Sequence, residues 1–153
     1  MPLKGLGDVS NAIDDLVLKQ NDNVKGVYLT GLSSIVSGTP ADKGRARNNW
    51  FLSVGAPLNK TIASKSKSGS NSIRQVLVMP KIVLGKKIFF SNNLPYIGAL
   101  EYGGFPTPVK KGSYNSRAKS YEVLSINGFS KQAPNGWVRK AVIKMANKIR
   151  SLN

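Results

Sequence analysis

The 153-residue chain contains no cysteine and no histidine. The lack of cysteine excludes a disulfide framework and a thiolate metal site, and without histidine the ordinary ligands of transition metals are missing. A cation site made of oxygen ligands stays open. Histidine is also the side chain whose unperturbed pKa lies nearest neutrality, so catalysis would need a perturbed carboxylate, lysine or tyrosine. We therefore expect a protein that is not an enzyme and that uses no cofactor.

Long apolar runs are also missing. No segment approaches the eighteen or so apolar residues that span a bilayer, and the first ten residues lack the apolar stretch of a signal peptide. We expect a soluble chain that is made and used without export and that has no membrane partner.

Acidic residues are scarce after position 42. Residues 43–153 contain twenty Lys and Arg against two Glu, a net charge of +18, whereas residues 1–42 contain three Lys and five Asp, a net charge of −2. Such a polycationic body favours polyanions or acidic partners. Lysine outnumbers arginine 17 to 6, which favours diffuse attraction over base-specific recognition. The candidate contacts with DNA or with a neighbouring subunit are loop cations, namely Lys65, Lys67, Lys110, Lys111, Arg117 and Lys119. The alternative is a positive surface that only keeps the chain in solution.

The spacing of apolar residues predicts an α+β fold in one domain, residues 1–153. Steps of three and four over residues 9–36 predict an N-terminal helix of up to about 30 residues, which the polar stretch "QNDN" at 20–23 could divide. The stretches "NNWFLSVG" and "KKIFFSNN" predict strands, and residues 73–85 fit either a short helix or an edge strand. A C-terminal helix carries an apolar stripe at Val138, Val142, Met145, Ile149 and Leu152. We expect a small antiparallel sheet packed against both helices, with long basic loops at 59–72 and 103–120.

The segment "SNNLPYIGALEYGG", residues 91–104, is nearly uncharged within this basic body. Asn93 as N-cap, Pro95 in the first turn and Gly103 at the left-handed end predict a helix of about two turns. Glu101 lies at the helix end, where an acid opposes the dipole, so we expect an ion pair, either between subunits or between loops. Trp137 fits either a core anchor or a contact residue at an interface.

Two catalytic arrangements need consideration. Glu101 and Glu122 could form the paired carboxylates of a hydrolase, but two acids among so many cations are ordinarily ion-paired. A Ser–Lys pair in "SKSKS" would need a desolvated lysine, and this segment has the composition of an exposed loop. Neither arrangement changes the expectation that the chain is not an enzyme.

Three segments follow one another along the chain in an order that is characteristic of one protein family: "TPADKGRARNNW", "IFFSNNLPYIGALEYGG" and "SKQAPNGWVRKAV". In this the chain resembles the tail-completion or neck (head-tail joining) proteins of long-tailed bacteriophages. In that family a P-x-D-T-G-x-L-R-x-S turn, an NN-x-P-Y-x-x-x-L-E-x-G segment and an AP-x-G-x-V-R helix start recur. The resemblance extends from the N-terminal helix through residue 145. It departs at Lys43, Ala46 and Trp137, where the family commonly has Thr, Leu and Met.

The resemblance implies a structural virion protein of the neck, made in the host cytoplasm. Copies would form a homo-oligomeric ring, expected to have six members, between the head-closure protein and the tail terminator protein. Genomic double-stranded DNA would pass through the lumen during ejection, with non-specific contacts. The candidate interface residues are Tyr96, Glu101, Tyr102, Trp137 and Arg139. The alternative function is a basic nucleic-acid-binding protein without sequence specificity.

Overall fold

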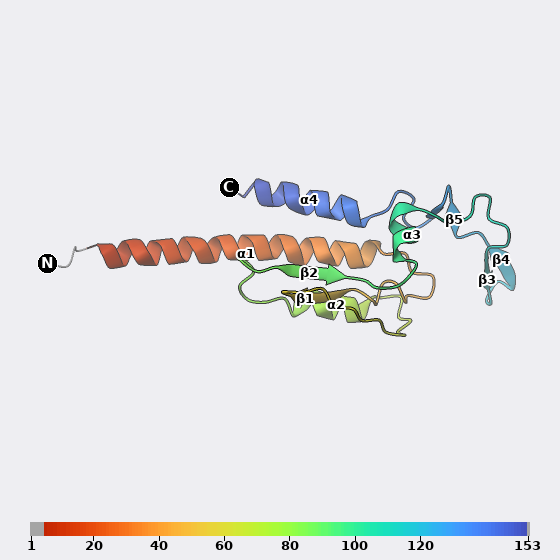
Figure 1. The fold of residues 1–153 in the computed structure, drawn as a ribbon, viewed down its shortest axis with the longest axis horizontal. Coiled ribbons are helices and arrows are strands. Elements are labelled where there is room, and N and C mark those ends of the chain that lie inside the picture. The colour runs from red at the N-terminus through yellow and green to blue at the C-terminus, as the bar shows by residue number, and fades with distance from the viewer. Residues whose placement is uncertain (1–4, 153) are drawn as a thin grey trace.

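One long helix organises the fold. The structure, a computed structural model, describes residues 5–152, and helix α1 (Leu6–Gly38) runs unbroken for 33 residues (Figure 1). The possible break at residues 20–23 does not occur. Asn21 is buried there and uses its whole amide in a tertiary contact: Oδ1 accepts the N–H of Val83 at 2.8 Å, and Nδ2 donates to the carbonyl of Lys81 at 2.9 Å. The polar residue therefore fixes a distant loop and leaves the helix intact.

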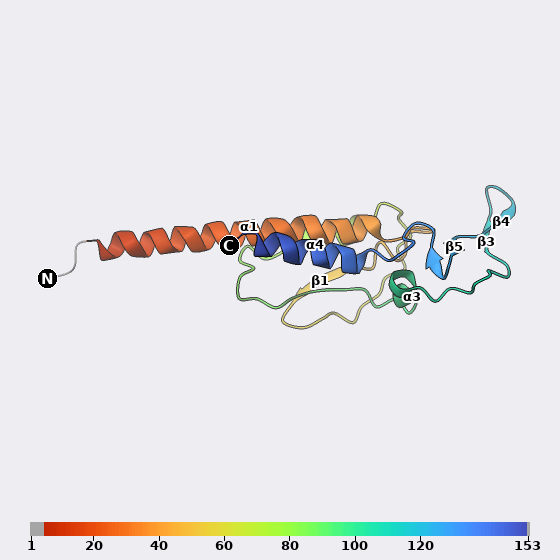
Figure 2. The same cartoon turned by 90° about the horizontal axis from the view of Figure 1, so that it is seen from above.

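Helix α4 (Val138–Arg150) packs antiparallel to the second half of α1 (Figures 1 and 2). A Cβ atom at Gly31 would overlap the thioether of Met145, so this glycine allows the two helices to approach closely. The predicted α4 stripe is correct for Val138, Met145, Ile149 and Leu152. It is wrong for Val142, which is 48% exposed, because Ala141 takes the place facing α1.

Strands β1 (Phe51–Val54) and β2 (Ile88–Ser91) form an antiparallel pair beside α1, with Leu52 opposite Phe90. Trp50 stacks on Phe90 with a centroid distance of 5.2 Å. Helix α2 (Ser70–Leu77) packs on β1 and α1 and ends before Pro80, so the helical alternative for residues 73–85 is correct at its N-terminal end. Both strands were expected from the sequence.

The core is formed by the second half of α1, α2, the residues around Trp50, and the segments that lead into α3 and α4. Its fully buried members include Val36 and Val76, and the cluster also contains Val24, Leu32, Ile35, Met79, Val83, Leu94, Leu100, Trp137 and Ala141. The predicted α+β class is confirmed. Instead of one small sheet, residues 5–152 contain three separate two-stranded antiparallel pairs.

Helix α3 (Ile97–Tyr102) is the short helix expected in residues 91–104. Gly103 follows its last residue with a φ of 83° and a ψ of −179°, so glycine does supply the positive φ at this end, but not in the left-handed helical conformation that was predicted. The prediction of Asn93 as the N-cap is wrong, because Nδ2 of Asn93 donates to the carbonyl of Leu58 at 2.6 Å and the helix begins four residues later. Asn93 thus fastens the loop after β1.

Two hairpins occupy the region after α3. They are β3 (Ser113–Asn115) with β4 (Ser120–Glu122), and β5 (Ser125–Ile126) with β6 (Phe129–Ser130). The expected long loop at 103–120 therefore contains a hairpin, which lies at the opposite end of the molecule from the start of α1 (Figure 1). Within residues 5–152, no helix has both the length and the apolar character that crossing a membrane requires.

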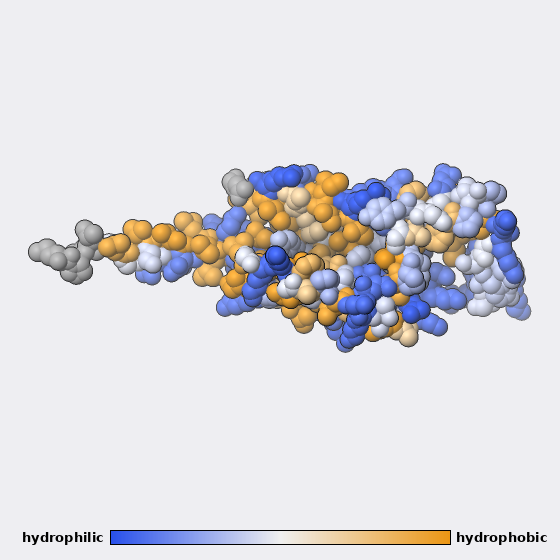
Figure 3. Space-filling model, in the orientation of Figure 1, coloured by the Kyte–Doolittle hydropathy of each residue, from blue (hydrophilic) through white to orange (hydrophobic). Residues whose placement is uncertain are grey.

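The first part of α1 projects beyond the rest of the molecule in both ribbon views (Figures 1 and 2). Every residue from 6 to 19 is exposed, and burial begins with Asn21. We call residues 6–19 the arm. Apolar residues follow it along much of its length (Figure 3).

Candidate functional site

The three segments that carry the resemblance, residues 39–50, 88–104 and 130–142, meet near the C-terminal end of α1. Asn92 links the second to the first, since its Nδ2 donates to the carbonyl of Ala46 at 2.9 Å. Gln132 links the third to the first, since its Oε1 accepts the N–H of Ala41 at 2.8 Å. Glu101 links the second to the third. We call this meeting point the junction.

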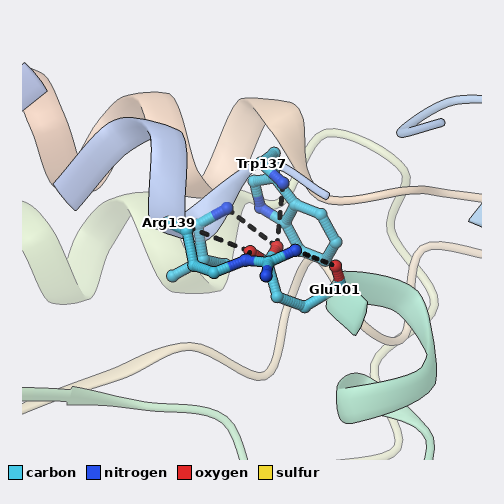
Figure 4. Close-up of polar contacts among 4 residues, drawn as sticks. Glu101, Trp137 and Arg139 are labelled. Atoms are coloured by element: carbon cyan, nitrogen blue, oxygen red, sulfur yellow. Dashed lines mark hydrogen bonds and ion pairs between the residues drawn. The ribbon is translucent and has the colours of Figure 1, made fainter. Parts of the chain in front are cut away.

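Glu101 holds the start of α4 (Figure 4). Its Oε2 accepts the backbone N–H groups of Trp137 at 2.8 Å and Val138 at 2.9 Å, and its Oε1 accepts that of Arg139 at 3.0 Å. These N–H groups belong to the first turn of α4 and have no partner within the helix. A carboxylate at this end is also favoured by the helix dipole. Glu101 therefore opposes the dipole of its own short helix but stabilises that of a longer one.

Arg139 completes the contact. Its Nε donates to Oε1 of Glu101 at 3.0 Å and its Nη2 donates to the Glu101 carbonyl at 3.2 Å. This is the one ion pair in residues 5–152, and it lies within the chain, between α3 and α4. Of the two expected arrangements, the structure therefore has the one inside the subunit. Gly136, with a φ of 70°, lies so close that a side chain there would overlap Glu101.

The pKa of Glu101 reflects this environment. Burial acts to raise the pKa, but the hydrogen bonds from the backbone N–H groups of Trp137, Arg139 and Val138, and from the Arg139 side chain, outweigh it. The pKa of Glu101 therefore lies below its ordinary value. The carboxylate stays charged at neutral pH, where all of its donors need a negative acceptor.

Two tryptophans fasten the end of α1. Nε1 of Trp137 donates to the carbonyl of Ile35 at 2.9 Å, and Nε1 of Trp50 donates to Oγ1 of Thr39 at 2.9 Å. Trp137 is 9% exposed. Of the two alternatives for Trp137, core anchor or contact residue, its position fits the core anchor.

Two buried asparagines organise the basic loop at 59–69. Asn49 exchanges hydrogen bonds with Ile62, accepting its N–H at 2.7 Å and donating to its carbonyl at 3.0 Å. Asn48 donates to the carbonyls of Gly44 and Ser66 and accepts the N–H of Asn71. The loop is therefore held to the junction at several points, and the long basic loop expected at 59–72 ends at residue 69, where α2 begins. Nothing in the sequence pattern marks these side chains as buried.

The five candidate interface residues divide by exposure. Glu101 and Trp137 are internal, so their side chains are not available to a neighbouring subunit, contrary to expectation. Tyr102 is 66% exposed, and the Arg139 guanidinium lies 4.7 Å from its ring centroid. Tyr96 is 38% exposed. Tyr102, Arg139 and Tyr96 are therefore the members that a partner can reach.

Tyr96 lines a cavity of about 550 Å³ that also has Lys43, Arg45 and Lys65 in its wall, together with residues at the base of the β3–β4 hairpin. Burial raises the pKa of Tyr96, and the charge of Arg45 partly opposes this. The structure thus places Lys65 beside the hairpin, although the two are distant in sequence. Asp42 lines the same cavity, so its charge is mixed.

The other basic candidates concentrate on the β3–β4 hairpin. We call residues 110–122 the basic hairpin; it has four cations and one acid, a net charge of +3. Its cations are all exposed: Lys110, Lys111, Arg117 and Lys119. Tyr114 and Tyr121, each 56% exposed, pack edge to face at 5.3 Å, and Lys111 lies 5.2 Å from the Tyr121 ring. Lys67 is exposed on the loop fastened by Asn48.

The two carboxylates considered for hydrolysis have separate partners. Glu122 accepts a hydrogen bond from Nδ2 of Asn115 at 2.7 Å on the basic hairpin, whereas Glu101 is committed to α4. Lys65 and Lys67 are exposed, so nothing desolvates a lysine beside Ser66. Glu101 is therefore engaged in a structural contact rather than in a pair with Glu122, and the lysines beside Ser66 lack the desolvation that the Ser–Lys arrangement needs.

Comparison of the chain with protein-family models, with curated proteins and with solved structures found no match. The resemblance to neck proteins therefore depends on the three segments that form the junction.

Proposed function

We propose that the chain is a structural protein of the bacteriophage neck, a ring subunit that joins the DNA-filled head to the tail and transforms no substrate. The observation that supports this most is the junction. The three resembling segments are far apart in sequence, yet hydrogen bonds join all of them at one end of α1. The hydrogen bonds among these three segments therefore hold α1, α3 and α4 in a fixed arrangement.

The use of polar groups supports an assembly role. Within residues 5–152, every buried side-chain nitrogen and oxygen has a hydrogen-bond partner, which suits a junction that holds its elements in a fixed arrangement. What the fold presents outward is the arm at one end and the basic hairpin at the other (Figure 3). Projecting elements of this kind suit contacts with neighbouring subunits.

Charge supports the passage of DNA. Residues 43–153 have a net charge of +18, and only Arg139 is ion-paired with an acid in the described chain. A surface of unpaired, mostly lysine cations attracts phosphate without fixing a sequence or register. In the proposed ring, non-specific attraction of this kind tolerates DNA that must move.

The test is genetic. A nonsense allele of the gene, in a phage that carries it, should leave filled heads and finished tails unjoined in electron micrographs of the lysate. Supplying the wild-type chain from a plasmid should restore joined particles. Normal virions from the allele without that plasmid would refute the proposal.

A second candidate function, a free nucleic-acid-binding protein without sequence specificity, is favoured by the basic hairpin. Its exposed tyrosines offer stacking surfaces and its cations offer phosphate contacts. The affinity of the purified chain for DNA should then fall steeply with salt. An affinity that does not change with salt would exclude this candidate, whereas a steep fall combined with normal virions from the nonsense allele would favour it over the neck proposal.

A further inference from the structure

The arm exposes a continuous apolar stripe. Its members are 53% to 65% exposed and follow helical spacing: Leu6, Val9, Ile13, Leu16 and Val17. The same helical face continues into Val24 and Gly31, where the body of the molecule covers it. A helix surface of this kind normally lies against another apolar surface. Within the described chain, α4 ends before it reaches the arm (Figure 1).

The opposite face of the arm is acidic. Asp8 and Asp15 are seven residues apart and so lie on one side, with Asp14 beside the stripe. The arm has three aspartates and one lysine, a net charge of −2, whereas residues 43–153 carry +18. Two arms packed against each other would bring together two segments that each carry a net charge of −2, with Asp14 of each beside the contact. A contact between the arm and the body of another copy places opposite charges together.

The body has a groove that fits such a helix. It lies between α1 and α4, has a volume of about 800 Å³, and is lined on α1 by the small residues Gly26, Thr30 and Ser34. Met145 and Leu152 of α4 give it apolar walls, and Lys144 and Lys148 add positive charge. Small residues allow a second backbone to approach closely. The α1 residues of the groove span positions 23–34, a length of about 16 Å at 1.5 Å per residue, and the arm is about 21 Å long.

We propose that the arm of one copy lies in the α1–α4 groove of the next copy. The apolar stripe covers Met145 and Leu152, and Asp14, at the edge of the stripe, lies on the side of Lys144 and Lys148. The contact joins two different surfaces, so it is heterologous and repeats from copy to copy, closing into a ring if the rotation allows. The inference deepens the proposed neck function, on which its role in a ring rests, by naming the surfaces that join the subunits.

Cysteine trapping tests the contact directly, because the full chain has no native cysteine. Thr30→Cys in the groove is combined in turn with Val9→Cys, Ile13→Cys or Leu16→Cys in the arm. The nearest of these pairs is fourteen residues apart on one straight helix, about 21 Å, so no disulfide can form within a chain. Mild oxidation of at least one pair should give a ladder of dimers, trimers and larger species on a non-reducing gel.

The single-cysteine variants are the controls. Leu16→Cys alone should stay monomeric on oxidation, and dimers from it at the yield of the pair would show that arms meet arms, which would overturn the inference. The absence of cross-linked species from all three pairs would overturn it as well.

A charge exchange tests the same contact without oxidation. Sedimentation of the purified chain measures self-association, and Lys144→Glu with Lys148→Glu should weaken it by about tenfold or more. Adding Asp14→Lys to that variant should restore part of the loss. Failure of the combined variant to recover, while its circular dichroism matches the wild type, would contradict the pairing.

A matched pair of isoleucines tests the apolar stripe. Ile13→Gln in the arm should weaken association by about tenfold or more, because the contact would bury an isoleucine side chain that the change replaces with a polar one. Ile143→Gln is the control, since Ile143 is 59% exposed on the side of α4 away from the groove, close to the 54% of Ile13. Equal effects of the two changes would contradict the proposal.

The outcomes separate this inference from the neck function. A ladder that continues without closing would support the arm contact and count against the ring. No ladder, together with unjoined heads and tails from the nonsense allele, would leave the neck function in place and overturn the arm contact.

Discussion

Replacing Glu101 with glutamine should destabilise the fold far more than its single ion pair suggests. The change is nearly isosteric, but it removes the charge and turns one oxygen into an NH₂ donor. Each Glu101 oxygen accepts two N–H groups, either those of Trp137 and Val138 or the two from Arg139. In either orientation of the amide, two donors then face another donor.

The size of the loss follows from the burial of the site. The Glu101 side chain is 7% exposed, and each buried group left without a partner costs about 1–3 kcal/mol. With the lost attraction to the α4 dipole, about 1 kcal/mol, two unpaired donors lead us to expect Glu101→Gln to cost about 3–7 kcal/mol. Domains are stable by only about 5–15 kcal/mol, so the variant should be close to unfolding.

The assay is urea unfolding at pH 7, followed by circular dichroism and tryptophan fluorescence. Arg139→Gln is the matched control, because the Arg139 side chain is 53% exposed and its loss should cost only about 1 kcal/mol or less. Equal losses for the two variants, or a loss below about 1 kcal/mol for Glu101→Gln, would refute the role of Glu101 as the acceptor for α4.

The contribution of Glu101 should also depend on pH. Its pKa is lower in the folded chain than in the unfolded one, so its stabilisation is fully present above the unfolded value and is lost as pH falls through the folded value. The stability difference between wild type and Glu101→Gln should therefore be constant near neutrality and shrink in acid. A difference that grows as pH falls would contradict the lowered pKa.

Three further predictions concern other contacts. Gly31→Ala should lower the free energy of unfolding in urea by about 1–3 kcal/mol, because the new methyl group overlaps Met145. Adding Met145→Ala should recover part of this loss. No recovery would argue against the contact. Asn49→Ala should lower the free energy of unfolding by about 2–4 kcal/mol, because the backbone N–H and carbonyl of Ile62 both lose their partner. The loop at 59–69 should then be cleaved faster by protease. Unchanged cleavage would contradict the anchoring by Asn49. Changing the four cations of the basic hairpin to Gln should reduce the slope of log affinity for DNA against log salt by up to about 3.6, and an unchanged slope would place the phosphate contacts elsewhere.

Much of the fold could be predicted because the apolar periodicity is strong. The helices at both ends and the strands around Phe51 and Phe90 follow from it directly. The role of Asn93 could not be predicted reliably, because an asparagine amide serves equally well as an N-cap or as an anchor for a distant loop, and the structure has the second. Val142 was assigned to the wrong face because the small residue Ala141 gives a weak hydrophobic signal and yet fits the close contact with α1.

The junction was harder to predict. The position of Glu101 against its own helix dipole indicated that it needed a positive partner, and Arg139 is part of that partner. The backbone N–H groups of α4 could not be anticipated, because they become a site only when α3 lies against α4. Asn21, Asn48 and Asn49 gave no signal, since a polar residue in a sequence is ordinarily exposed and only the tertiary structure buries it with partners.

The most direct test of the central claim, that this chain acts as a fixed part of a virion, is to locate it in purified phage particles by cryo-electron microscopy. Several copies arranged around the axis at the head–tail connection are predicted, with the arm of each against the next. Particles that join head to tail normally and contain none of this chain would contradict the account.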